Sequence, residues 1–199
     1  MGSKLKRKSK NKCLPTNYVQ RMQTYMSKVN ITDRMIEESY YNLRLIAYQI
    51  MHDKFGFGQK RIIRLERTID EYMASNAEGG LHTDELLFFM KEKCDIDVNE
   101  EANMVSSKER FALTKCMIAS ESKKMAGLYL SSSILNYFSL LGVCLRTQFK
   151  FTPKQIREAY RWIRYYINTL SRPKQFELTF KDIAECLMDE VKYCDARFI

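Results

Sequence analysis

The sequence contains few residues that break helices. Only 3 prolines and 7 glycines occur among its 199 residues, whereas Leu, Ile, Met, Lys, Arg and Glu are common. This scarcity excludes a turn-rich β architecture, because such folds need proline and glycine at their many turns. The chain is also 45% hydrophobic, which is enough to bury a full core and too much for a disordered protein. An all-α globular fold is therefore expected.

Residues that typically carry out catalysis are scarce as well. Neither of the two histidines, His52 and His82, stands at a zinc-binding spacing such as H-E-x-x-H. Gly56 and Gly58 are too close together for a dinucleotide-binding fingerprint, and they follow a helical pattern rather than a strand. We therefore predict a protein that is not an enzyme and has no catalytic residue, no cofactor and no metal, with His52 and Asp53 as a helix-end pair.

Paired cysteine motifs are absent. The six cysteines form no C-x-x-C pair, and most lie in apolar helical stretches, where a small hydrophobic residue would serve equally well. We interpret them as reduced thiols in a cytoplasmic protein. The basic start of the chain leads into polar residues rather than an apolar run, so no secretory leader is expected.

The positive charge is unevenly distributed. The chain has a formal net charge of +9, and six cations with no acidic residue among them lie within residues 4–12. Residues 13–199 therefore carry a net charge of only +3. We predict a disordered basic tail over residues 1–13, which serves as a phosphate-binding arm, a localisation signal or a solubility extension. Its cations are Lys4, Lys6, Arg7, Lys8, Lys10 and Lys12.

An internal repeat organises the rest of the chain. The pattern F-x-F-x-x-K-x-I begins at Phe55 and again at Phe149, and seven identities fall between residues 55–73 and 149–167. Each copy leaves an apolar segment, crosses an aromatic turn and enters a basic amphipathic helix. The repeat predicts two similar four-helix halves, residues 14–97 and 98–199, packed as one globular unit. In each turn, the two phenylalanines are expected to staple the flanking helices.

Periodicity and capping signals predict about eight helices. Thr32 and Thr83 are candidate N-caps, while Ser106, Thr152 and Thr179 each begin a capping-box spacing. Residues 95–104 read as a loop that joins the halves. Residues 125–145 contain no charge, but their serines and Asn136 favour a central buried helix over a membrane span. The predicted helices are 16–29, 33–53, 59–75 and 83–94, followed by 107–125, 127–146, 153–170 and 179–193.

Two basic helices are the candidate contact surfaces. The helix at 153–170 follows a short turn after an apolar helix, which is the arrangement of a helix-turn-helix reader, and Trp162 or Tyr165 could stack on an unpaired base. A solvated or protein-binding face is the alternative interpretation of this helix. The helix at 59–75 is the weaker copy, because three acidic residues offset its cations. The candidate contact residues are Lys154, Arg157, Arg161 and Arg164 in the second copy and Lys60, Arg61 and Arg64 in the first.

The stretch His52-Asp53-Lys54-Phe55-Gly56-Phe57-Gly58-Gln59-Lys60-Arg61-Ile62 resembles uncharacterised small helical proteins of phages and prophages of Gram-positive bacteria. The likeness covers about residues 41–97, and the second copy departs from it, since Lys150 and Thr152 replace the two glycines. The resemblance implies a cytoplasmic protein of a bacterial host cell. Accessory proteins of this kind often bind nucleic acid or block host machinery.

Two main functions follow as hypotheses, and a structural or virion role is a third. The first is an accessory protein that binds nucleic acid or a nucleoprotein complex through the tail and a basic helix, mainly by phosphate contacts. The alternative is a protein-protein inhibitor or adaptor that acts on a host protein, such as a counter-defence factor of the anti-CRISPR kind directed at a nucleic-acid-targeting complex, with a homodimer as one possible assembly. Neither hypothesis involves a membrane.

Overall fold

The computed structural model describes residues 16–80, 82–114 and 123–193, with side chains from residue 31 onward except at 76 and 77. Within these ranges the chain forms nine α-helices, one π-helix and no strand, which confirms the all-α prediction. The helices are α1 (Thr16–Phe55), α2 (Gln59–Ala77), α3 (Thr83–Cys94), α4 (Val98–Asn103), α5 (Ser107–Ala112), α6 (Lys123–Gln148), α7 (Pro153–Leu170), α8 (Pro173–Phe176), α9 (Phe180–Cys186) and the π-helix η2 (Leu187–Val191).

The first two predicted helices form one continuous helix in the structure. Helix α1 runs for 40 residues without interruption, so the predicted break near Asn30 and the N-cap at Thr32 are wrong. Neither proline nor glycine stands between the two segments. A single capping residue is not enough to end a helix whose backbone can continue its hydrogen bonds and whose neighbours pack against it.

The region that joins the two predicted halves contains a short helix rather than only a loop. Residues 95–104 were expected to form a loop, but they contain α4, whose N-cap Asp97 accepts hydrogen bonds from the N–H groups of Asn99 and Glu100. Val98 and Ala102 lie one turn apart in α4 and are both buried, so burial of this short apolar stripe stabilises the helix. The next helix begins with the predicted capping box of Ser106 and Glu109 but ends at Ala112 instead of continuing to 125.

The C-terminal elements combine a confirmed helix with a revised one. Helix α7 has the predicted bounds, with Thr152 as N-cap, a capping box with Gln155, and proline in the first turn. The predicted helix at 179–193 begins with its capping box at Thr179 but changes at Leu187 into the π-helix η2.

In the first half of the chain, one predicted helix cap is also revised. The N-cap of α3 is His82 rather than Thr83.

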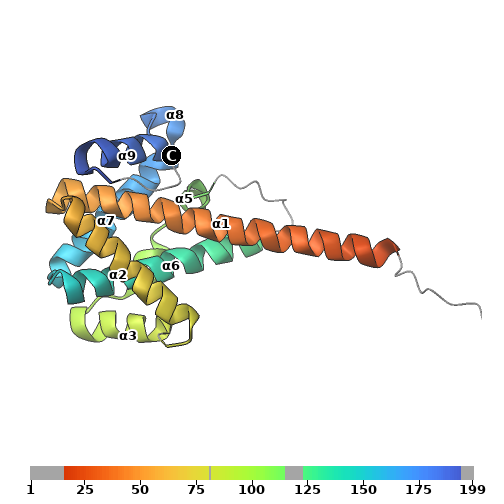
Figure 1. Ribbon diagram of the computed structural model, residues 1–199, viewed down its shortest axis with the longest axis horizontal. Helices are drawn as coiled ribbons and strands as arrows, with labels where there is room; N and C mark the ends of the chain where they lie inside the picture. The colour runs from red at the N-terminus through yellow and green to blue at the C-terminus, as the bar shows by residue number, and fades with distance from the viewer. Residues whose placement is uncertain (1–15, 81, 115–122, 194–199) are drawn as a thin grey trace, which may run out of the picture.

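Helices α1 and α6 pack against each other at the centre of the fold, and the other helices cover them (Figure 1). Helices α2 and α3, which follow α1 in sequence, pack on α6. Helices α7 and α9, which follow α6, pack on α1. Each central helix is thus covered by helices from the other half of the chain. The duplication itself stays a prediction, but the contacts are reciprocal in the way that a pseudo-two-fold arrangement requires.

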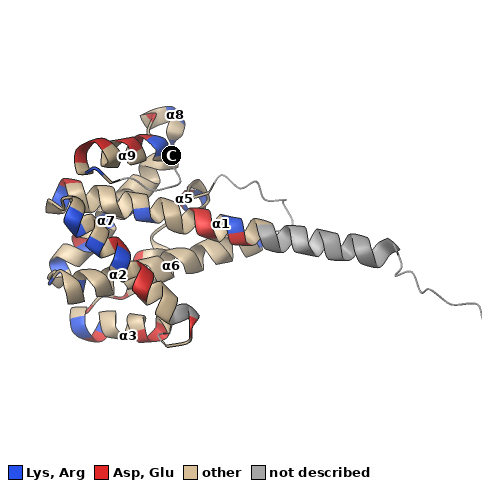
Figure 2. Ribbon diagram, in the orientation of Figure 1, with Lys and Arg blue, Asp and Glu red and all other residues tan. Residues whose placement is uncertain are grey.

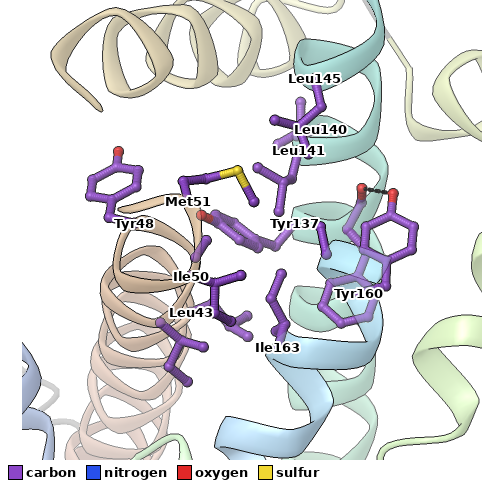
Figure 3. Close-up of a cluster of buried hydrophobic side chains, with 14 of the residues drawn as sticks. Leu43, Tyr48, Ile50, Met51, Tyr137, Leu140, Leu141, Leu145, Tyr160 and Ile163 are labelled. Carbon is purple, nitrogen blue, oxygen red and sulfur yellow. Dashed lines mark hydrogen bonds between the residues drawn. The ribbon is translucent and has the colours of Figure 1, made fainter. Parts of the chain in front are cut away.

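One hydrophobic core joins both halves (Figure 3). Leu43, Ile50 and Met51 from α1 meet Tyr137 and Leu141 from α6, and all five are at most 1% exposed. Helix α6 is long and apolar enough to cross a membrane by length and composition, yet 67% of its most apolar 18-residue stretch is buried inside the protein. The central helices of folded domains share this composition.

Gly142 of α6 marks the tightest packing of the core. A Cβ atom added there would lie 2.1 Å from the Tyr160 hydroxyl oxygen and 2.7 Å from Cε of Met90. The Met90 side chain can move, but the Tyr160 hydroxyl donates a buried 2.6 Å hydrogen bond to the Phe138 carbonyl oxygen. Glycine is therefore required where α6 meets α3 and α7.

We predict that Gly142→Ala lowers the free energy of unfolding by about 1–3 kcal/mol, because the added methyl group over-packs a filled core and displaces the Tyr160 hydroxyl. Chemical denaturation of both proteins measures the change. Gly127→Ala is the matched control in the same helix, since a Cβ at Gly127 has nothing within 4 Å. It should raise stability by up to about 1 kcal/mol through helix propensity. Equal effects of the two substitutions would contradict the packing described here.

Candidate functional site

The two aromatic turns have the same backbone structure. Gly56 has φ +64 and Lys150 has φ +59, both in the left-handed region that ends helices. The Phe57 N–H donates to the Met51 carbonyl at 2.9 Å, and the Phe151 N–H donates to the Leu145 carbonyl at 3.0 Å. These bonds join equivalent positions of the two repeats. Each turn therefore reverses the chain in the same way and begins a basic helix at the same point.

The side chains of the two turns interlock. Phe57 lies 4.9 Å from Phe149 between ring centroids, and Phe55 lies 5.0 Å from Phe151. Phe57 and Phe151 also meet edge to face at 5.9 Å. The phenylalanines were expected to staple helices within each turn, whereas their ring contacts run between the turns. This interlock places the starts of α2 and α7 at one end of the molecule, on the left in Figure 1.

Five exposed cations lie on the second turn and near the starts of α2 and α7, and we call this set the basic pole. Lys and Arg are coloured blue in Figure 2, which shows them on the first part of α2. The guanidinium of Arg61 lies 3.7 Å from the ring centroid of Phe57, and that of Arg64 lies 5.4 Å from the ring centroid of Phe149. Arg64 also donates to the side-chain oxygen of Gln148 at 3.1 Å. Arg61 thus lies on the turn of its own repeat, and Arg64 reaches the turn of the other repeat. The basic pole consists of Lys60, Arg61, Arg64, Lys150 and Lys154.

None of these five cations forms an ion pair with another described residue. The starts of α2 and α7 also point their positive dipole ends toward the same region. Unpaired cations and helix N-termini are both features that favour phosphate groups. The sequence named four of the five residues, and the structure brings all five together.

The other predicted arginines of α7 have partners within the protein. Arg157 donates to the Asp95 carbonyl oxygen at 2.6 Å and pairs with the Asp95 carboxylate, and Arg161 lies 3.7 Å from the Glu158 carboxylate. Arg164 pairs closely with Glu101, and the two side chains are only 20% and 14% exposed. Burial lowers the pKa of Arg164 from its ordinary value. These three residues therefore do not form the single free basic face expected from the sequence.

The cations of the predicted tail lie outside the described residues. This applies to the whole set Lys4, Lys6, Arg7, Lys8, Lys10 and Lys12.

A cleft beside α7 is the second candidate site. A cleft of about 560 Å³ opens between the end of α1, α7, α8 and α9. Four aromatic side chains line it, and the ammonium of Lys54 lies 4.2 Å from the Trp162 ring centroid. The stacking residues considered for α7 therefore face a cleft rather than an open helix surface. The aromatic lining consists of Trp162, Tyr165, Tyr166 and Phe176.

Two polar atoms around this cleft lack partners in the described structure. They are the Gln49 side-chain oxygen and the Trp162 indole nitrogen. Gln49 is 5% exposed, and its amide nitrogen donates to Asp53 at 2.8 Å. Burial, with the nearby Asp53 carboxylate as a second cause, raises the pKa of Tyr166 to about 12, so its hydroxyl stays protonated and donates to Asp53. Both unpartnered atoms are buried from solvent, so they belong to the wall behind the cleft rather than to its accessible surface.

Three features of these sites were not predicted from the sequence: the role of Lys150, the burial of Gln49 and the contact of His52 with Glu190. Lys150 replaces a glycine of the first copy, so it appeared as a departure from the pattern rather than as a cation of the basic pole. Gln49 gave no signal, because its importance comes from burial. His52 lies 3.1 Å from Glu190, which is 138 positions away, and no local spacing indicates that contact.

No protein-family model, no curated protein and no solved structure matches this chain. The resemblance to phage and prophage proteins therefore stays a prediction. Function has to be inferred from the geometry of the basic pole and of the cleft.

We predict that Arg164 is structural. Arg164→Ala should lower the free energy of unfolding by about 1–3 kcal/mol, because it leaves the half-buried Glu101 carboxylate without its partner. Arg161→Ala, in the same helix, should change stability by less than about 0.5 kcal/mol, since its ion pair is exposed. Urea denaturation of the two variants tests this difference. Equal stability of both variants would show that the Arg164–Glu101 pair does not hold α7 to α4.

We also predict that Lys150→Gly raises the free energy of unfolding by about 0.5–1 kcal/mol, because glycine adopts the left-handed conformation without steric cost. Gly56→Ala at the equivalent position should lower it by about 1–2 kcal/mol. Thermal or chemical denaturation provides the measurement. Lys154→Gly is a control that removes the same charge from a regular helix, and it should destabilise by about 1 kcal/mol. A loss of stability with Lys150→Gly would be inconsistent with a left-handed Lys150.

Proposed function

We propose that this protein binds nucleic acid or a nucleoprotein complex through the basic pole, mainly by sequence-independent contacts to phosphate. The observation that supports this most directly is that some basic residues have no acidic partner in the described structure, whereas others do. Lys60, Arg61 and Arg64 come together with Lys150 and Lys154, and none of them is neutralised by a described carboxylate. In contrast, Arg157, Arg161 and Arg164 each lie beside an acidic residue of the protein.

The geometry favours a polyanion with many phosphate groups over a single small anion. The five cations are spread over the starts of two helices and the second turn, so they form a surface rather than a cup. Arg61 and Arg64 lie against phenylalanine rings, which orient their planar guanidinium groups and leave N–H donors available. Such a surface suits a polyanion that makes several contacts at once. The basic tail would add further contacts to the same ligand.

Neutralising the basic pole should weaken binding in a salt-dependent way. For the variant Lys60→Gln, Arg61→Gln, Arg64→Gln and Lys154→Gln, we predict lower affinity for duplex DNA of any sequence. The slope of log affinity against log salt should fall in magnitude by about 3–4, since each lost phosphate contact removes about 0.9. Fluorescence anisotropy at several salt concentrations measures both quantities in the full chain, with its tail intact.

The matched control removes the same total charge from exposed positions elsewhere, with Lys93→Gln, Lys108→Gln, Lys124→Gln and Lys174→Gln. This variant keeps the net charge of the first one but leaves the basic pole unchanged. The proposal requires a clear difference between the two variants. Equal salt slopes for the two variants would mean that binding depends on net charge or on the tail alone. Affinity that is unchanged in both variants would refute nucleic-acid contact at the basic pole.

The alternative function is a protein-protein inhibitor or adaptor, and the cleft beside α7 is the observation that favours it. Tyr165 is 56% exposed and Phe176 is 43% exposed, which is unusual for aromatic residues without a partner surface. An aromatic or aliphatic side chain of a host protein would fit between them. Binding to one protein that is insensitive to salt and sensitive to Tyr165→Ala, without any oligonucleotide binding, would favour this function.

A further inference from the structure

Three potential metal ligands meet where the end of α1 contacts the π-helix η2. They are His52 and Asp53 from α1 and Glu190 from η2, and their ligand atoms all lie within 4.8 Å of one another. The group combines one imidazole with two carboxylates. Side chains of this type bind zinc and related divalent transition metals.

Both ring nitrogens of His52 face oxygen atoms that accept hydrogen bonds. Its Nδ1 lies 3.0 Å from the Phe57 carbonyl oxygen, and its Nε2 lies 3.1 Å from a carboxylate oxygen of Glu190. Both neighbours accept hydrogen bonds and cannot donate them. A neutral imidazole has only one N–H, so one of the two contacts would place lone pairs against each other. Either a second proton on the ring or a metal ion beside Nε2 removes this conflict.

The carbonyl contact also orients the ring as a metal ligand. When Nδ1–H donates to the Phe57 carbonyl, the lone pair of Nε2 points at Glu190. Histidines that bind metals commonly donate their other ring N–H to a backbone carbonyl in this way, which fixes the tautomer and the ring plane. Because Phe57 belongs to the interlocked turns, this carbonyl is held firmly.

The two carboxylates are supported by their surroundings. One oxygen of Asp53 accepts a 2.8 Å hydrogen bond from Gln49, and the other accepts a 3.1 Å hydrogen bond from Tyr166. Each of these oxygens keeps a lone pair for a metal. Gln49 is almost fully buried, so it fixes the position of the carboxylate it contacts. Such outer contacts are a usual feature of metal sites.

The backbone around Glu190 is also tied to the first repeat. Gln59 of α2 donates to the Lys192 carbonyl at 2.8 Å, and the Tyr193 hydroxyl donates to Glu66 of α2 at 2.5 Å. The π-helix itself is an uncommon conformation that occurs frequently at functional sites. Glu190 therefore reaches His52 from a segment whose position is set by α2.

We propose that His52, Asp53 and Glu190 bind one divalent transition-metal ion of the zinc class and thereby fasten η2 to the end of α1. Ligand atoms around a tetrahedral ion are about 3.4 Å apart when the bonds are about 2.1 Å long, so the exposed carboxylates need only small side-chain rotations to close on the ion. Water completes the coordination. This proposal does not depend on nucleic-acid binding.

Titration with Co²⁺ tests the site, using the full chain in its reduced state. Co²⁺ reports its ligands through visible absorption, and a thiolate ligand adds a charge-transfer band in the near ultraviolet. We expect one equivalent of Co²⁺ to bind with visible bands and without the thiolate band, and Zn²⁺ to displace it. The spectrum thus separates this site from binding by any of the six cysteines.

His52→Ala and Glu190→Gln should each weaken binding by about 10-fold or more, and the metal should no longer raise the melting temperature of either variant. His82→Ala is the matched control, because His82 is the other histidine of the chain and lies at the start of α3. It should bind as the unmodified protein does. No binding, a thiolate spectrum, or equal binding by the His52→Ala and His82→Ala variants would overturn the proposal.

Discussion

The interlock of the two aromatic turns is the contact on which the rest of the structure depends. Each turn ends a central helix with a left-handed residue at the equivalent position and with the same backbone hydrogen bond, and each buries a phenylalanine against the other turn. An aromatic pair contributes about 0.5–1.5 kcal/mol beyond the burial of its area. Phe55, Phe57, Phe149 and Phe151 form three such pairs, and they fix how α2 and α7 leave the centre of the fold.

This interlock also determines which charges remain available. Because α2 and α7 begin at the same end, their first-turn cations lie close together, and repulsion between them favours a bound polyanion. Further along α7, Arg157 and Arg164 reach acidic residues at the end of α3 and in α4. Among the described residues, helix α7 therefore presents one free cation, Lys154, at its start and structural ion pairs in its middle. Net charge alone does not distinguish these roles.

The cleft and the cluster around His52 lie close together, and Asp53 joins them. Asp53 accepts hydrogen bonds from Gln49 and Tyr166, which both line the cleft, and it belongs to the group that contains His52 and Glu190. A metal bound by that group would be connected to the cleft through a single carboxylate. Both features depend on α9 and η2 packing against the end of α1. In the described structure, the basic pole and this second region thus use different parts of the same scaffold.

The sequence by itself determined the features that depend on neighbouring residues. The bounds and capping box of α7, the capping boxes at Ser106 and Thr179 and the all-α class follow from hydrogen bonds and propensities within four residues of each position. The sequence also named Lys60, Arg61, Arg64 and Lys154 of the basic pole, since their charges are visible in the repeat.

Tertiary structure decided which of these residues are free and which are paired. The continuity of α1, the ion pairs of Arg157 and Arg164, the burial of Gln49 and the approach of Glu190 to His52 all depend on contacts between distant segments. Such contacts span 62 to 138 positions in sequence. No periodicity or local spacing encodes them, because they arise only when the helices pack and the side chains compete for the same partners.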